Sequence, residues 1–89
     1  MEAQQPAEQE LREQLAKIRD LIAESRDNSY ELDSLEEDLR QMLADGRVSR
    51  LHYDVQMARL RKAHDKNRAH AQTLAYSHKV LIYELSRLA

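Results

Sequence analysis

Residues 45–49 read DGRVS, and this stretch separates two long segments that are rich in helix-forming residues. Gly46 can adopt the left-handed backbone conformation that commonly follows the end of a helix. Ser49 is suited to be the N-cap of a second helix, because a serine hydroxyl accepts a hydrogen bond from a backbone N–H of the first turn. Val48 before it can complete a hydrophobic staple. The stretch therefore predicts the end of one helix, a tight turn and the start of another.

The composition excludes most architectures other than helices. One Gly and one Pro in 89 residues cannot supply the turns of a β-sandwich, a barrel or an α/β sheet, and the absence of Cys removes disulfides and thiolate metal sites. Ala, Leu, Glu, Arg and Gln are abundant, and all five favour helices. A domain of this size buries a limited share of its surface, so we expect it to gain stability by self-association.

Apolar residues in both segments recur at alternating steps of four and three, the spacing of a coiled-coil seam. Before the turn, with one short step, the seam comprises Leu11, Leu15, Ile18, Ile22, Ser25, Ser29, Leu32, Leu35, Leu39 and Met42. After the turn it comprises Tyr53, Met57, Leu60, His64, Asn67, Ala71, Leu74, His78, Leu81, Leu85 and Leu88. We therefore predict an all-α, antiparallel two-helix coiled-coil hairpin, with a disordered segment over 1–6, a helix over 7–44, a turn over 45–49 and a helix over 50–88.

The segment 25–29, SRDNS, leaves a second arrangement open. Its residues have modest or poor helix propensity, and Asn28 with Glu31 could start a new helix. A break there would give three helices. In the continuous hairpin, facing positions have numbers that sum to 96, which places Ser29 opposite Asn67, so the polar positions of the two seams meet.

The two segments carry opposite charge. Residues 1–46 have thirteen acidic and five basic side chains, whereas residues 47–89 have three acidic and nine basic side chains. The antiparallel register places the basic part of the second helix beside the acidic residues of 31–37. We therefore expect one arm to neutralise the other, which favours this pairing over like-with-like assembly.

A basic cluster in the second helix supports an alternative function. Its members are dense enough to contact phosphates, as in a nucleic-acid-binding protein or a regulator of the transcription machinery. They are Arg59, Arg61, Lys62, Lys66 and Arg68. The chain has no Phe, no Trp and no Gly-rich loop to stack on bases, and its isoelectric point is about 6.1. We therefore expect internal charge pairing in preference to nucleic-acid binding.

We expect no catalytic site, no metal site and no cofactor. The sequence has no Gly-rich phosphate loop, no nucleophile elbow and no HExxH motif. None of its four histidines has a second histidine or a carboxylate three or four residues away, the spacing that places two metal ligands on one helix face. His64 and His78 are instead predicted to lie in the seam, where protonation would bury charge.

The stretch 43–60, LADGRVSRLHYDVQMARL, resembles the SHOCT type of short helical segment. That segment has a helix ending in Asp-Gly, an aliphatic residue, a Ser or Thr cap, an aromatic residue four positions later and a final Leu. The matching positions are Asp45, Gly46, Val48, Ser49, Tyr53 and Leu60. Residues 50–52, RLH, replace the acidic run that is usual there. The resemblance covers about a fifth of the chain and implies an association module that is often attached to other domains.

The second helix carries more apolar residues than one facing helix can cover. An apolar arc this wide is typical of a helix with two neighbours, as in a four-helix bundle. We expect this flank to join two hairpins into a homodimer or to receive an amphipathic helix from another protein. The predicted contact residues are Tyr76, Val80, Ile82, Tyr83, Leu51 and Val55.

The sequence as a whole predicts a non-catalytic, cytoplasmic interaction protein, as a small chaperone, adaptor or protein inhibitor would be. The N-terminal residues have neither the basic segment nor the apolar run of a targeting sequence. The longest apolar run, residues 80–83, is far shorter than the roughly 18–20 residues that a membrane helix needs. We therefore expect partners that are proteins and no membrane.

Overall fold

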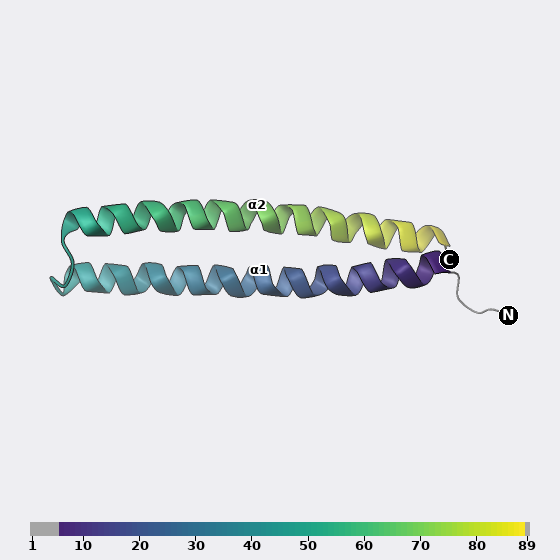
Figure 1. The fold of residues 1–89 in the computed structure, drawn as a ribbon, viewed down its shortest axis with the longest axis horizontal. Helices are drawn as coiled ribbons and strands as arrows, with labels where there is room; N and C mark the ends of the chain where they lie inside the picture. The colour runs from purple at the N-terminus through teal and green to yellow at the C-terminus, as the bar shows by residue number, and fades with distance from the viewer. Residues whose placement is uncertain (1–5, 89) are drawn as a thin grey trace.

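The computed structural model describes residues 6–88 and consists of two antiparallel helices joined by one turn (Figure 1). Helix α1 spans Pro6–Ala44 and helix α2 spans Arg50–Leu88, with 39 residues each. The predicted all-α hairpin is thus confirmed, and α1 begins one residue before the predicted range. The predicted disordered segment lies outside the described residues for 1–5, and its last member, Pro6, is the first residue of α1.

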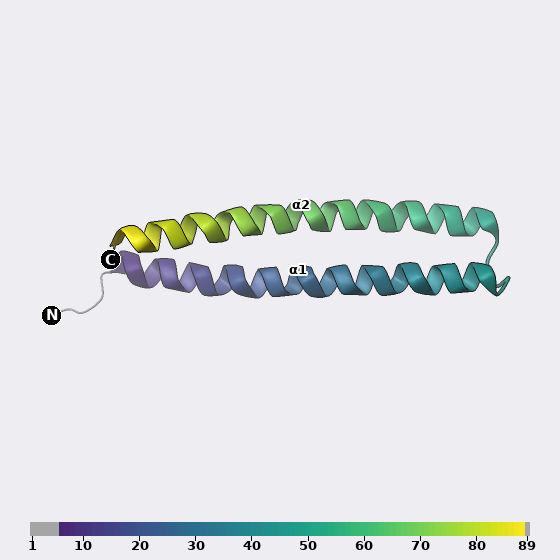
Figure 2. The same cartoon turned by 180° about the vertical axis from the view of Figure 1, so that it is seen from behind.

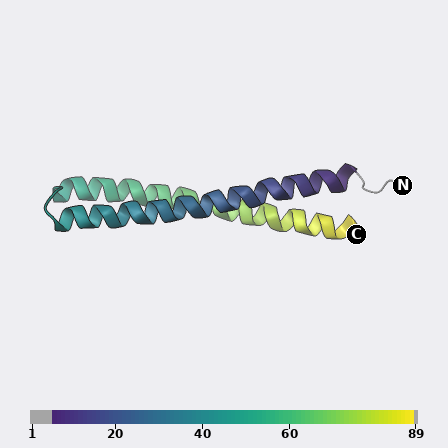
Figure 3. The ribbon, with the colours of Figure 1, turned by 90° about the horizontal axis from the view of Figure 1, so that it is seen from below.

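The helices form a rod with extents of 70 × 16 × 13 Å. Viewed from the opposite side, the two helices still lie side by side along their whole length (Figure 2). Seen edge-on, they cross near the middle of the rod (Figure 3). Such a crossing is what a seam with a seven-residue repeat requires, because each helix must wind slowly to keep its apolar stripe against the other.

The turn has the hydrogen bonds of a Schellman motif. The backbone N–H of Arg47 donates to the carbonyl of Met42 over 2.9 Å, and that of Gly46 donates to the carbonyl of Leu43 over 3.1 Å. Gly46 has a φ of 73°, a conformation that costs a residue with a side chain free energy. On the far side of the turn, the backbone N–H of His52 donates to the hydroxyl of Ser49 over 3.1 Å, so Ser49 caps α2 as expected.

Helix α1 continues without interruption through residues 25–29, so the three-helix alternative is wrong. Hydrogen bonds from the facing helix α2 stabilise this segment of α1, whose own helix propensity is weak. The Ser25 hydroxyl donates to Asn67 Oδ1 over 3.2 Å, and Asn67 Nδ2 donates back to the Ser25 carbonyl over 3.0 Å. Asn67 is predicted to face Ser29 but bonds to Ser25, one helical turn away. These bonds between the helices override the weak helix propensity of residues 25–29.

The hydrophobic core of the hairpin is small. Among the side chains described, five apolar ones are buried: Leu15, Leu39, Met57, Leu74 and Leu81. Ser25, which is 5% exposed, is the buried polar residue between them. Most other seam residues are only half-buried, because a single facing helix covers one side of each. The rod therefore keeps apolar surface that a further helix could cover.

The predicted seam is wrong at Leu35. This side chain is 53% exposed, and Glu36 takes the half-buried position next to it. The sequence pattern predicts Leu35 in the seam because it is apolar, although it follows Leu32 by three residues where the alternation requires four. The helices instead keep the strict alternation of four and three, because a shift of one residue would rotate the rest of α1 away from α2.

Candidate protein-interaction surface

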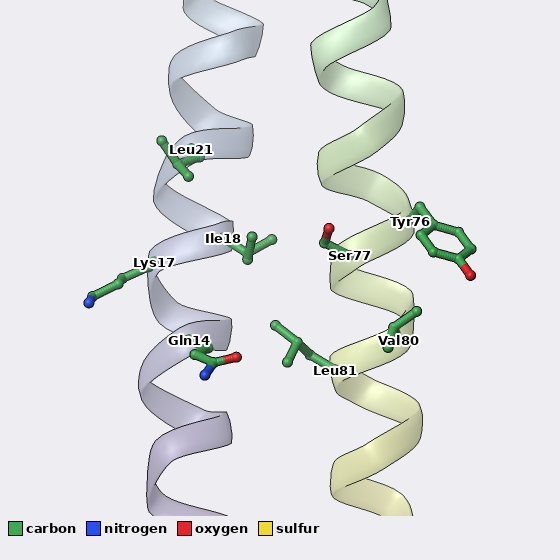
Figure 4. Close-up of a pocket in the computed structure, with 8 residues that line it drawn as sticks. All are labelled: Gln14, Lys17, Ile18, Leu21, Tyr76, Ser77, Val80 and Leu81. Carbon is green, nitrogen blue, oxygen red and sulfur yellow. The ribbon is translucent and has the colours of Figure 1, made fainter.

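The two helices define a rod with two broad faces, and both faces carry hollows. Where α1 begins and α2 ends, an open groove of about 510 Å³ lies between the helices. It is lined by Gln14, Lys17, Ile18, Leu21, Tyr76, Ser77, Val80 and Leu81. Figure 4 shows Ile18 and Leu81 extending toward the facing helix, whereas Lys17 and Tyr76 point outward at the two edges. We call this side of the rod the groove face.

Two more hollows continue the groove face toward the turn. The first, of about 470 Å³, is lined by Asn28, Glu31, Leu32, Leu35, Ala63, Lys66, Asn67 and His70. The second, of about 370 Å³, is lined by Leu35, Asp38, Leu39, Met42, His52, Gln56 and Leu60. Leu35 belongs to both hollows, and Leu21 precedes it by fourteen residues, two heptads, on the same side of α1. The exposed Leu35 thus has a place in an apolar track that runs along most of the rod.

The two edges of the groove face carry opposite charge. On α1 the hollows are bordered by Lys17, Glu31 and Asp38, which are seven or fourteen residues apart and exposed. Glu24 has the same spacing, so three of the four positions on this edge are acidic. On α2 the matching edge contains His52, Arg59, Lys66, Thr73 and Val80, at steps of seven residues. One long edge is therefore mostly acidic, and the other has basic residues and no acidic one over this range.

The predicted contact flank does not form one surface. Val80 and Tyr76 line the groove, and Tyr76 is 70% exposed. Ile82 comes two residues after Val80, about 200° further round the helix, and so lies toward the other face. Tyr83 follows Tyr76 by seven residues and so lies on the same side of α2, although it borders none of the hollows described above.

The other two residues of the predicted flank lie at the turn end of α2. Leu51 and Val55 are exposed, as a contact surface requires. Leu51 precedes Tyr76 by 25 residues, which is about 38 Å along the helix. Val55 shares the side of Tyr76, since it precedes it by three heptads, whereas Leu51 and Ile82 lie on other sides of α2. The structure adds Ile18, Leu21 and Leu35 from α1 to the groove face. Counting in steps of seven along α1 would have placed Leu21 and Leu35 together.

The expected neutralisation of one arm by the other is not made by direct contacts. Within the described part of the chain, no Arg or Lys of α2 forms an ion pair with a carboxylate of α1. The ion pairs of arginine lie within one helix: Arg12–Glu8 at 3.1 Å, Arg40–Glu36, Arg50–Asp54 at 3.1 Å and Arg68–Asp65 at 3.7 Å. The charges of the two arms thus face each other along the rod without direct ion pairs between their Arg or Lys side chains and carboxylates.

A histidine of α2 does lie close to carboxylates of α1. His64 Nε2 lies 3.4 Å from Glu36 Oε2 and 3.7 Å from Asp33 Oδ1, although it forms no hydrogen bond. The seam that half-buries this imidazole thus also brings Glu36 and Asp33 of α1 close to it.

The five basic residues of the alternative interpretation are exposed and surround α2 on three sides. Arg59 and Lys66 belong to the groove face, and Lys62 is on the outer side of the helix. Arg61 and Arg68 line hollows on the opposite face of the rod. The five residues are close in sequence but do not form one basic surface, because adjacent positions in a helix differ in direction by about 100°.

The opposite face brings arginines of both helices to one place. A hollow of about 380 Å³ is lined by Ile22, Ser25, Arg26, Ser29, His64, Asn67, Arg68 and Ala71. Arg26 and Arg68 thus border the polar layer formed by Ser25 and Asn67. Arg12 and Arg19 precede Arg26 at intervals of seven residues and so share its side of α1. This row of arginines was not found in the sequence, because it lies in the helix that is acidic overall.

Comparisons with family models, with curated proteins and with solved structures find no significant match for this chain. Neither described helix has a stretch that is long and apolar enough to cross a membrane. Within residues 6–88, no group of three His, Cys, Asp or Glu side chains is placed to hold a metal ion. The function is therefore argued from the surface of the rod.

Proposed function

We propose that this protein is a cytoplasmic, non-catalytic interaction module that self-associates and receives helices along its groove face, as a small chaperone, adaptor or protein inhibitor would. The observation that carries the proposal is the open groove bordered by Leu21, Val80 and Tyr76. It lies on a hairpin whose described core has only five buried apolar side chains. An apolar groove between two helices is a binding mode for the apolar stripe of a third helix.

The spacing of the groove face fits an amphipathic helix. Leu21 and Leu35 are separated by about 21 Å along α1, a distance that four turns of a docked helix span. Apolar residues of that helix would enter the groove near Ile18 and Val80 and the middle hollow near Leu35. The charged edges on either side would then contact the polar flanks of the docked helix.

A double substitution at the groove tests the proposal. Leu21→Glu with Val80→Glu places two carboxylates where an apolar stripe must dock, and we expect at least a tenfold loss of the protein captured from the native host. The mass of the captured complex and the helical circular dichroism of the variant are the measurements. Tyr30→Glu is the matched control, because Tyr30 is 65% exposed on α1 and lines none of the hollows described above. Equal capture by the double variant and the wild type would refute the proposal.

The arginines of the opposite face favour a second candidate function, the binding of nucleic acid. Arg26 and Arg68 border one hollow from the two helices, and Arg26 makes none of the ion pairs described above. A guanidinium binds phosphate in a bidentate manner, and a row of them at heptad spacing can follow a phosphate backbone. Ser29 and Asn67 add polar groups to the same hollow.

Replacing both arginines tests this second candidate. Arg26→Gln with Arg68→Gln removes two phosphate contacts, so the slope of log affinity against log salt should fall by about two. A gel shift with short single-stranded RNA at several salt concentrations provides the measurement, with Lys62→Gln as the control. No shift by the wild type at low salt would eliminate this candidate.

A further inference from the structure

The two edges of the groove face carry opposite charges, and these charges indicate what kind of chain can cover the face. The acidic edge includes Glu31 and Asp38 of α1, and the basic edge includes Lys66 of α2. Glu31 and Lys66 line the same hollow, so they lie at the same level along the rod. Neither is paired with the other, and both are exposed. Such a face is complementary to a copy of itself that places α1 over α2.

Two symmetric arrangements can bring two groove faces together. If the two-fold axis runs parallel to the rod, α1 of each copy lies over α2 of the other, and both turns are at the same end. If the axis runs across the rod in the plane of the helices, α1 lies over α1, and the turns are at opposite ends. Both arrangements are closed, as most homodimers are. They differ in which charges meet.

We propose that the groove face is covered by a second copy of this chain, with both turns at the same end of the dimer. In this arrangement Glu31 of one copy meets Lys66 of the other, and Asp38 meets the edge that contains Arg59. In the alternative arrangement the α1 edges meet with inverted levels, so Glu31 of one copy lies near Glu24 of the other and Asp38 lies near Lys17. Lys66 then comes level with Thr73 and meets no carboxylate, so this assembly gains less from its charges.

The apolar parts of the face support the same arrangement. Residues that line one hollow lie at one level, so the end groove of one copy covers the end groove of the other. Leu21 then packs over Tyr76 and Val80 of the second copy, and the aliphatic part of Lys17 covers Val80. A rod of 70 Å by 16 Å offers a face on the order of 1,000 Å², above the ~800 Å² per partner of a stable interface.

A distance between the two turns tests the arrangement. The chain has no Cys, so Arg47→Cys provides a single labelling site in the turn, outside the hollows described. With spin labels at this site, we expect a separation under about 40 Å, because the two turns would then be one bundle width apart. Turns at opposite ends would be separated by roughly 60 Å, the length of a helix. The longer distance would overturn the inference.

A pair of charge reversals tests the contact itself. Glu31→Lys alone and Lys66→Glu alone should each weaken self-association at least tenfold, whereas an equimolar mixture should form a heterodimer with wild-type affinity. Both positions are exposed, so the hairpin remains folded, as circular dichroism will show. Stronger self-association of the Glu31→Lys variant is the result expected for turns at opposite ends, and it would contradict the inference.

This inference rests on the proposed function, and the mass of the chain in solution separates their failures. Sedimentation equilibrium should give twice the chain mass of 10.4 kDa for the wild type and 10.4 kDa for the variant with Leu21→Glu and Val80→Glu. If the wild type is a monomer and its capture of another protein still depends on Leu21 and Val80, the second copy is wrong but the proposed function is supported. If the double variant still forms a dimer and captures as much protein as the wild type, both the second copy and the proposed function are wrong.

Discussion

Leu74→Ala is expected to remove a large share of the free energy of unfolding of the hairpin. Leu74 is 5% exposed and belongs to the five described apolar side chains that form the core. Truncation of a buried leucine to alanine removes about 2–5 kcal/mol, since the lost contacts are joined by the cost of a cavity. Small domains have a total free energy of unfolding of only about 5–15 kcal/mol. A rod that is one helix pair thick has no second layer that could close over the cavity.

A leucine on the surface of the same helix provides the control. Leu51 is 73% exposed, so Leu51→Ala should change the free energy of unfolding by no more than about 0.5 kcal/mol. Urea unfolding of both variants at one protein concentration measures the difference, because the proposed self-association would make stability depend on concentration. Similar midpoints for the two variants would show that the seam around Leu74 contributes little.

Replacing the polar layer formed by Ser25 and Asn67 should stabilise the hairpin, unlike truncation of Leu74. The double variant with Ser25→Leu and Asn67→Leu is expected to be more stable than the wild type by about 1–3 kcal/mol, which raises the melting temperature by roughly 5–15 °C. It exchanges two hydrogen bonds across the seam for apolar contact at a buried position. The hollow beside Ser25, about 380 Å³ in volume, leaves room for the larger side chains.

The more stable double variant should lose its single register and its single oligomeric state. A polar residue in a coiled-coil seam fixes register and oligomeric state, because any other alignment leaves it buried without a partner. We therefore expect the double variant to sediment as a mixture of species. Thermal circular dichroism and sedimentation velocity are the measurements, and Ser34→Leu, at an exposed position, is the control. A melting temperature below that of the wild type would mean that the hydrogen bonds stabilise the hairpin more than apolar packing can.

The hairpin could be predicted because its determinants are local and repeated. Gly46 and Ser49 end one helix and begin the next through backbone conformation and capping, which depend on few residues. The heptad spacing then leaves an antiparallel pair as the way to bury both seams. The continuity of α1 through residues 25–29 could not be predicted in the same way. It depends on Asn67, which is 42 residues from Ser25 in the chain.

The surface was harder to predict, because it depends on direction around each helix and not only on residue type. Leu35 was assigned to the seam because it is apolar, yet its neighbour Glu36 occupies that position. The prediction adds Ile82 to the stripe formed by Tyr76, Val80 and Tyr83, although Val80 and Ile82 point to different faces. Counting by sevens would have separated Ile82 from the other three residues. It would also have shown that Glu31 and Asp38 share an edge.

The uniform seven-residue repeat makes the length of the rod adjustable. Removing seven residues from α1 together with the seven at the same level of α2 would shorten the rod by about 10 Å and leave every remaining layer with its present neighbour. Removing two residues from one arm alone would instead rotate the rest of that arm by about 200° and turn Leu39 or Leu15 outward. The hairpin is in this sense modular, with the heptad pair as its unit. Its span can change by whole units while the turn and the faces keep their geometry.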